Sequence, residues 1–119
     1  MDRKIFRQKW VGMKRGDLIT VSLPGNYGKP RPALIIQSDL FDVHPSITIL
    51  PITSELQDAP LFRILVEPDS ENGLCNISQI MVDKTHTIPR DKAREPFGRL
   101  SETLMLSVNR ALAVFLGFG

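Results

Sequence analysis

Apolar and polar positions alternate, or form short apolar runs, through the first half of the chain. Residues 18–23 alternate with the period of two that is typical of a half-buried strand. Residues 33–36 are continuously apolar, which predicts a buried strand, and the β-branched residues of 47–52 predict a central strand. Pro51 would have to lie at the end of this strand or at a bulge, because proline has no N–H to donate.

Shorter strand segments follow in the second half. Residues 39–46 predict a connection with one helical turn, and residues 62–67 alternate as a strand does. Residues 74–82 predict another strand, with the polar pair Ser78 and Gln79 in its interior. A last short strand is predicted over residues 85–88, followed by a charged, proline-bounded loop over residues 89–96.

Beyond Gly98 the apolar period changes from that of a strand to that of a helix. Apolar side chains recur at helical spacing at Leu104, Val108, Ala111, Leu112 and Phe115. Ser101 is a suitable N-cap and Gly117 a natural stop. Five to seven short strands followed by a terminal helix predict an α+β fold or a small β-barrel.

Length and composition indicate one ordinary globular domain. The chain has 119 residues, of which 42% are hydrophobic and 24% charged, and no apolar run approaches the length of a membrane span. Cys75 is the single cysteine, so an internal disulfide is excluded, and with only His44 and His86 besides it a dedicated zinc site is not expected. No secretion signal is evident, so we expect a cytoplasmic protein.

The first residues are basic and precede the first strand pattern. We treat residues 1–12 as a basic N-terminal extension, either a short amphipathic helix or a loose arm, and place the domain at residues 13–119. The net charge is +2, and lysines and arginines crowd the first fifteen residues. This crowding could create a basic face for a polyanion, although a basic tail is as often merely solvated.

A rigid cationic turn leads into the strand at residues 33–36. Pro30 and Pro32 fix their own φ angles and push the residues before them toward extended geometry. The guanidinium of Arg31 therefore projects from a nearly determined position, which suits recognition of a phosphate. The alternative is an ordinary solvent-facing arginine at the mouth of a strand.

Several short motifs follow one another in an order that resembles a known family. They are Arg15-Gly-Asp-Leu-Ile19, Arg31-Pro-Ala-Leu-Ile-Ile36, Pro51-Ile-Thr-Ser54, Ser78-Gln79, Asp83-Lys84, Thr87-Ile88 and Phe97-Gly-Arg-Leu-Ser101. In this order and spacing, across residues 13–116, the chain resembles the MazF/PemK family of toxin endoribonucleases.

The resemblance implies a fold and a function. The fold would be a small SH3-like β-barrel, similar to that of the CcdB toxins, in a homodimer. The activity would be sequence-specific cleavage of single-stranded RNA, usually mRNA, without metal or cofactor. A cognate antitoxin would inhibit it by laying a disordered C-terminal segment in the RNA groove.

The family positions assign roles to Arg31 and Thr53, and two further residues of this chain are candidates beside them. Arg31 would hold the phosphate and stabilise the charge of the transition state. Thr53 would donate to the scissile phosphate, with Ser54 as its neighbour; alternatively, both hydroxyls only bond the backbone of a turn. His86 is a candidate general base because imidazole titrates near neutrality, but a histidine in a strand is often structural.

RNA recognition would fall to loop and strand residues. Asn26 and Tyr27 could bond to and stack on an unpaired base, while Lys29 attracts phosphate. Ser78 and Gln79 are further candidates for RNA binding, although a buried glutamine can equally satisfy strand backbone. Trp10 and the basic extension could contribute to RNA or antitoxin binding.

One departure from the family pattern concerns the general base. Family members often have an acidic residue before the glutamine of the later strand, and this chain has Ser78 there. The remaining candidates for the base are Asp83, His86 and Asp17, or none, with phosphate positioning supplying most of the rate.

Two other functions stay open at this level. A CcdB-like gyrase poison would use a terminal aromatic-glycine segment, to which residues 115–119 bear a likeness. A non-catalytic RNA-binding module of the same fold would account for the missing carboxylate. RNA cleavage by the purified protein separates the first function from both alternatives.

Overall fold

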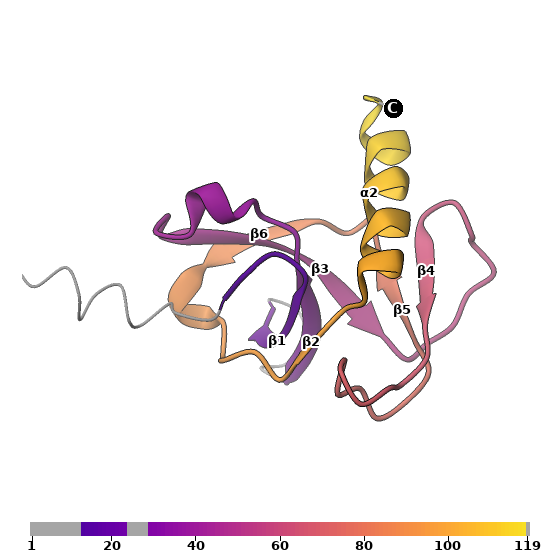
Figure 1. Ribbon diagram of the computed structural model, residues 1–119, viewed down its shortest axis with the longest axis horizontal. Helices are drawn as coiled ribbons and strands as arrows, with labels where there is room; N and C mark the ends of the chain where they lie inside the picture. The colour runs from indigo at the N-terminus through magenta and orange to yellow at the C-terminus, as the bar shows by residue number, and fades with distance from the viewer. Residues whose placement is uncertain (1–12, 24–28, 119) are drawn as a thin grey trace, which may run out of the picture.

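The computed structural model describes residues 13–23 and 29–118, which form a curled sheet and a terminal helix (Figure 1). The strands are β1 (Asp17–Ser22), β2 (Pro30–Ile35), β3 (Ser46–Thr53), β4 (Arg63–Val66), β5 (Ser78–Met81), β6 (His86–Pro89) and β7 (Gly98–Arg99). Two short 3-10 helices, η1 (Asp39–Phe41) and η2 (Arg90–Lys92), and the α-helix α2 (Glu102–Leu116) complete the described elements. The predicted strands, the helical turn after residue 38 and the terminal helix are confirmed as elements. The cationic segment at residues 30–32 is not a turn before the strand as predicted: it pairs with β1 and forms the first half of β2.

All strand pairings among the described residues are antiparallel. The order of strands is β4-β5-β3-β2-β1-β7, and β6 pairs with β3 as well. A bridge between Val21 and Ala93 brings the segment after η2 back onto β1. The sheet thus curls on itself, and the predicted α+β architecture, a small barrel of five to seven strands with a C-terminal helix, is confirmed.

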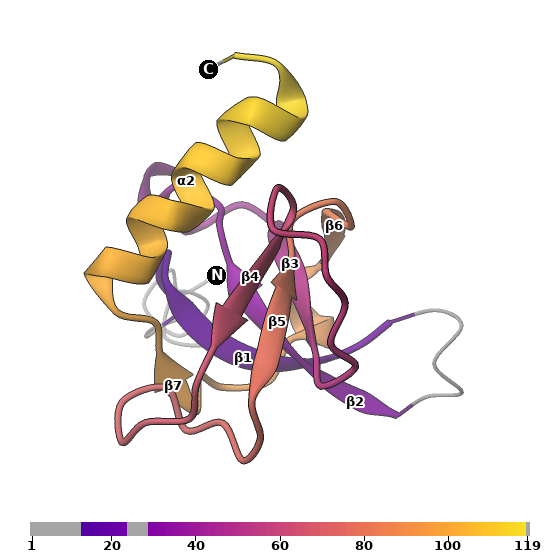
Figure 2. The same ribbon diagram turned by 90° about the vertical axis from the view of Figure 1, so that its right-hand side faces the viewer.

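The sheet buries apolar side chains on both of its faces. Leu18 and Leu34 lie on one face and pack in the same core as Leu112 of α2, which crosses this side of the sheet in Figure 2. Ile19 and Ile35 lie on the other face, in a second core that the curl encloses. Successive residues of β1 and β2 are therefore buried on opposite faces, which is why the sequence of these strands is so continuously apolar.

Pro51 lies inside β3, and the prediction that it ends the strand or forms a bulge is wrong. One edge of β3 pairs with β2, and the other pairs with β6 at residues 46–49 and with β5 at residues 52–53. The carbonyl of Thr48 accepts from the N–H of Ile36 on the β2 side. By alternation the nitrogen of Pro51 points to the other edge, where it falls between the two partner strands.

Strand β5 is shorter than predicted, and Ser78 is its first residue rather than an interior one. The residues before it belong to the 67–77 loop, which connects β4 and β5. Asn72 is only 1% exposed; its Oδ1 accepts the N–H groups of Asp69 and Leu74, and its Nδ2 donates to the carbonyl of Glu67. A side chain that satisfies three backbone groups favours a loop over a strand.

The charged, proline-bounded segment 89–96 has one buried charge, because Arg90 is 2% exposed. Its Nε donates to the carbonyl of His44 at 2.8 Å, and its Nη2 donates to that of Phe41 at 3.1 Å. Burial lowers the pKa of Arg90, and the negative charge of Asp42 opposes the shift. Arg90 therefore fastens the η1 turn to the end of β6.

Helix α2 begins and ends where the sequence predicts. The hydroxyl of Ser101 accepts from the N–H of Leu104 at 3.2 Å, and Gly117 closes the helix in the left-handed conformation. The apolar side chains of the helix could belong either to the core or to an interface: Val108 is fully buried in the core, whereas Phe115 is 49% exposed. The last turns of α2 project beyond the strands in both views (Figures 1 and 2).

Replacing Ser101 by alanine should lower the free energy of unfolding by about 1 kcal/mol, because the cap of α2 is lost. Ser107→Ala is the matched control: it makes the same change inside the helix, where alanine is the better helix former. Urea unfolding of both variants measures the difference. Equal midpoints for the two would contradict the assigned cap.

Three predictions lie outside the described residues: the basic extension at residues 1–12 with Trp10, the boundary of the domain at residue 13, and the loop with Asn26 and Tyr27. They stay predictions. In the parts of the chain that the structure describes, no helix is long and apolar enough to cross a membrane.

Candidate active site

Arg31 and Thr53 come from neighbouring strands. Arg31 is the second residue of β2, and Thr53 is the last residue of β3. Ala33 pairs with Pro51, so the antiparallel register carried on by two residues places Arg31 beside Thr53. The side chain of Arg31 is exposed between the two prolines that fix its backbone. The predicted phosphate clamp and the predicted hydroxyl therefore lie together.

Arg31 and Thr53 lie between two hollows of the surface, which together we call the groove. The first hollow has a volume of about 340 Å³ and the second about 440 Å³. Arg31, Thr53 and Ser54 line both of them. An extended ligand lying along the groove would thus pass over Arg31, with one hollow on each side of this residue.

The hydroxyl of Thr53 has one bond that leaves its proton free to act. Its Oγ1 accepts from the N–H of Glu55 at 3.1 Å, a local bond of the kind that serines and threonines make in turns. An acceptor role uses a lone pair of the oxygen, so the O–H can still donate to a phosphate oxygen. The turn bond therefore orients the predicted donor.

The 67–77 loop forms the wall of the first hollow through Gly73, Leu74, Cys75 and Asn76. Its conformation is held by Asn72, and on the outside by strand β7, where the N–H of Arg99 donates to the carbonyl of Glu71. Ser78 is buried and its hydroxyl donates to the carbonyl of Asn76 at 2.8 Å. Ser78 thus lines the first hollow, and its hydroxyl proton is engaged by the backbone of the wall; its role in RNA binding stays a prediction.

The side chain of Gln79 bonds to backbone groups of the protein and does not present its amide to the groove. Its Nε2 donates to the carbonyl of Gln57 at 2.8 Å, and its Oε1 accepts from the N–H of the same residue at 3.0 Å. Gln79 is 7% exposed. Both ends of the amide are used to hold the loop after β3, so the structure favours the backbone-satisfying interpretation over contact with a base.

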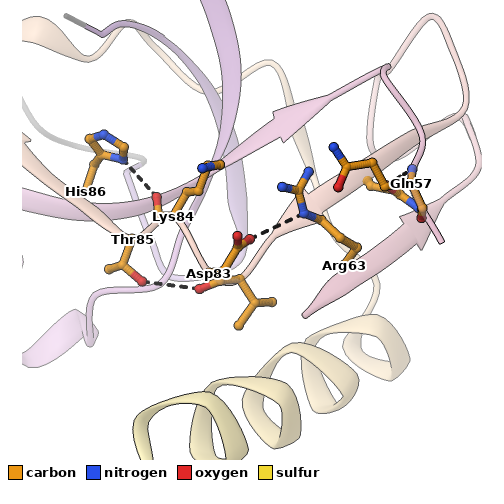
Figure 3. A network of polar contacts seen from close by, with 8 residues as sticks. Gln57, Arg63, Asp83, Lys84, Thr85 and His86 are labelled. Atoms are coloured by element: carbon orange, nitrogen blue, oxygen red, sulfur yellow. Dashed lines mark hydrogen bonds and ion pairs between the residues drawn. The ribbon is translucent and has the colours of Figure 1, made fainter. Parts of the chain in front are cut away.

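The turn between β5 and β6 forms the wall of the second hollow, to which it contributes Lys84 and His86 (Figure 3). Nε of Arg63 lies 3.3 Å from Oδ1 of Asp83, an ion pair between β4 and this turn. Nδ1 of His86 lies 2.8 Å from the carbonyl oxygen of Lys84. The turn is therefore tied down on both sides of Lys84.

Residues 14–116 match the family described as PemK-like, MazF-like toxins of type II toxin–antitoxin systems. A "Probable endoribonuclease MazF" of Mycolicibacterium smegmatis is 50% identical over 106 residues, which cover 88% of this chain and 97% of the relative. This chain belongs to the PemK/MazF toxin family.

Solved structures of other PemK/MazF proteins have the same fold. One is described as a mycobacterial endoribonuclease in complex with its cognate antitoxin, with a TM-score of 0.75 and 21% identity, covering 89% of this chain and 96% of that one. Another is the Mycobacterium tuberculosis toxin MazF-mt6, with a TM-score of 0.74 and 23% identity, covering 87% and 98%. At these identities the similarity establishes the fold.

The base candidates of this PemK/MazF chain are not equivalent in the structure. Asp17 is 7% exposed, and its two oxygens accept from Arg99 and from the N–H of Lys14. Asp83 is paired with Arg63. His86 lines the second hollow together with Arg31 and Thr53. Of the three, the geometry brings only His86 to the groove.

Several groove residues were missed by sequence reasoning. Glu55 and Lys84 line the second hollow, and Asn76 and Phe97 line the first. Glu55 directly follows Thr53-Ser54, so adjacency could have revealed it; Asn76 and Phe97 reach the groove only through the path of the chain. Lys29 is exposed and adjoins Pro30, which lines the first hollow, as a phosphate-attracting role requires.

The described residues contain no group of three or more histidine, cysteine, aspartate or glutamate side chains that could hold a metal ion. Charged groups in the groove are instead Arg31 and Lys84, with Glu55 as the carboxylate. The arrangement could offer two cations and a hydroxyl to a phosphate group. It could also offer the ring of His86 to a proton.

Proposed function

We propose that this protein is the toxin of a type II toxin–antitoxin system and acts as a metal-independent endoribonuclease on single-stranded RNA. The observation that carries the proposal is the placement of Arg31 beside Thr53 in the middle of an open groove. Family membership and a half-identical relative named as a probable endoribonuclease support it.

RNA carries its own nucleophile, the 2′-hydroxyl, so the protein has to activate it and stabilise charge at phosphorus. Arg31 can hold two phosphate oxygens with its planar fork, and the adjacent prolines keep the cost of ordering it low. Thr53 can donate to one of the same two non-bridging oxygens, and Ser54 lines both hollows beside it. The products are a cyclic phosphate and a free 5′-hydroxyl.

The groove also accounts for a single-stranded substrate. Phe97 is 41% exposed and lines the first hollow, where an unstacked base can lie against it, and Asn76 offers an amide to a base edge. Lys84 in the second hollow, and Lys29 beside the first, attract the flanking phosphates. Recognition of a short sequence would arise from these contacts, with Asn26 and Tyr27 as further candidates.

The partners follow from the same assignment. A cognate antitoxin would occupy the groove and exclude RNA, as expected of the family; one related structure is described as a complex with its cognate antitoxin. We expect a homodimer, for which the exposed apolar side chains at the end of α2 are available. An mRNA substrate would be met in the cytoplasm, where we expect the protein to act.

Incubation of the purified protein with single-stranded RNA in EDTA tests the proposal. We expect discrete fragments that end in a 2′,3′-cyclic phosphate and begin with a 5′-hydroxyl, with duplex RNA of the same sequence left intact. Binding of the RNA without fragments would identify a non-catalytic module. Inhibition of gyrase supercoiling without fragments would identify the CcdB-like alternative.

A further inference from the structure

The ring of His86 is held in one tautomer at the edge of the second hollow. Its Nδ1 lies 2.8 Å from the carbonyl oxygen of Lys84 (Figure 3). A carbonyl oxygen only accepts, so Nδ1 is the protonated nitrogen and Nε2 carries the lone pair of the neutral ring. We propose that Nε2 of His86 is the general base that activates the 2′-hydroxyl, an inference that rests on the proposed endoribonuclease function.

The position of His86 in the sheet supports this role. His86 pairs with Ile49 of β3, and Thr53 lies farther along the same strand. Side chains of a strand alternate between faces, so Ile49 and Thr53 share a face, and with them Arg31 and His86 from the strands on either side. All three polar side chains line the second hollow. Phosphate clamp, hydroxyl donor and base are thus on one surface.

The turn that precedes His86 is held by contacts on both of its sides. Asp83 is held by Arg63, whose side chain is 6% exposed. His86 begins β6, so its backbone is fixed in turn by pairing with β3. A base held by a rigid element loses little entropy when it meets the substrate, which is what general-base catalysis requires.

Three other charged groups face His86 across the second hollow: Arg31, Glu55 and Lys84. Arg31 and Lys84 are donors and cannot take a proton while charged. Glu55 is the competing base. It lies on the exposed segment after β3, whereas the ring of His86 is oriented by a hydrogen bond to the backbone, and this orientation favours His86.

The proposed chemical step is the transfer of one proton from the RNA to His86, coupled to attack of O2′ on phosphorus. Nε2 of His86 takes the proton of the 2′-hydroxyl while O2′ forms a bond to phosphorus and the bond from phosphorus to O5′ breaks. Arg31 holds the phosphate oxygens, and solvent water protonates the leaving O5′. The imidazolium then returns its proton to solvent, so the protein ends unchanged and the RNA carries a cyclic phosphate.

His86→Gln tests this assignment because the glutamine amide can still donate to Lys84 while it offers no base. We expect kcat/KM for RNA cleavage to fall about a hundredfold and its decline toward acidic pH to be lost. His86→Ala should regain activity when imidazole is added. His44→Gln makes the same change at an exposed histidine near η1 and should leave activity unchanged.

Each result decides between the assignments. If the wild-type protein cleaves RNA and Arg31→Ala does not, but His86→Gln stays within threefold of wild type, the base is wrong and the clamp stands. If Glu55→Gln, rather than His86→Gln, removes the acidic decline, the base is Glu55. If the wild-type protein leaves RNA uncut, the proposed function fails and the base assignment with it.

Discussion

Arg31→Ala is expected to lower kcat/KM for cleavage of single-stranded RNA about a thousandfold, with the free energy of unfolding unchanged within about 0.5 kcal/mol. The side chain is exposed and lines both hollows, so its removal takes away transition-state stabilisation without opening the core. Removing one preorganised donor aimed at developing charge commonly costs a hundredfold to a thousandfold, that is about 3 to 4 kcal/mol. A charged, two-pronged donor belongs at the upper end of that range.

Two further variants separate the shape of Arg31 from its charge. Arg31→Lys keeps the charge but loses the planar fork, so its activity should fall between those of the wild type and of Arg31→Ala. Arg110→Ala removes the same charge from the exposed surface of α2 and should cleave as the wild type does. Rates and urea midpoints of all three variants are the measurement. Activity of Arg31→Ala within threefold of wild type would show that the clamp is not Arg31.

Gly98→Ala should lower the free energy of unfolding by about 3 kcal/mol, and cleavage should fall with it. A methyl group at Gly98 would clash with the backbone carbonyl of Asn72, and with that of Glu71. Neither carbonyl can withdraw easily, because Asn72 is bonded within the 67–77 loop and Glu71 accepts from Arg99. The strain would therefore displace the loop that forms the wall of the first hollow.

Gly117→Ala is the control for Gly98→Ala. Gly117 has a φ of +87° and nothing within 4 Å of the site where a Cβ would stand, so its cost is the left-handed backbone alone, about 1 kcal/mol. Its position at the end of α2 should leave cleavage unchanged. A Gly98→Ala protein as stable as Gly117→Ala, with normal activity, would show that the 67–77 loop moves away freely.

Local sequence patterns predicted the elements well because each depends on neighbours along the chain. Helix α2 is an example: Ser101 caps it, the apolar period continues to Leu112, and Gly117 ends it. Phe115 follows the same period but is exposed, since by that turn the helix has passed the edge of the sheet (Figure 2). Periodicity marks a face of a helix and does not say how far a partner extends beneath it.

Local sequence patterns do not show which backbone groups are satisfied by residues far along the chain. Pro51 fits inside β3 only because two different strands share the far edge of β3. Arg90 is buried because the carbonyls of Phe41 and His44 lie within its reach. Both ends of the Gln79 amide form hydrogen bonds with the backbone of Gln57. None of these partners is close in the sequence, so no local pattern predicts them.

The sequence by itself determined that Arg31 is a cation on stiff, extended backbone, since the two prolines act on the backbone where they stand. Only the tertiary structure decided which side chains lie beside this cation. The pairing of β3 with β2 on one edge brings Thr53 to Arg31, and its pairing with β6 on the other edge brings His86 to the same hollow. The proximity of these side chains depends on strand order and register, which are set by packing across the whole sheet rather than by residues adjacent in the sequence.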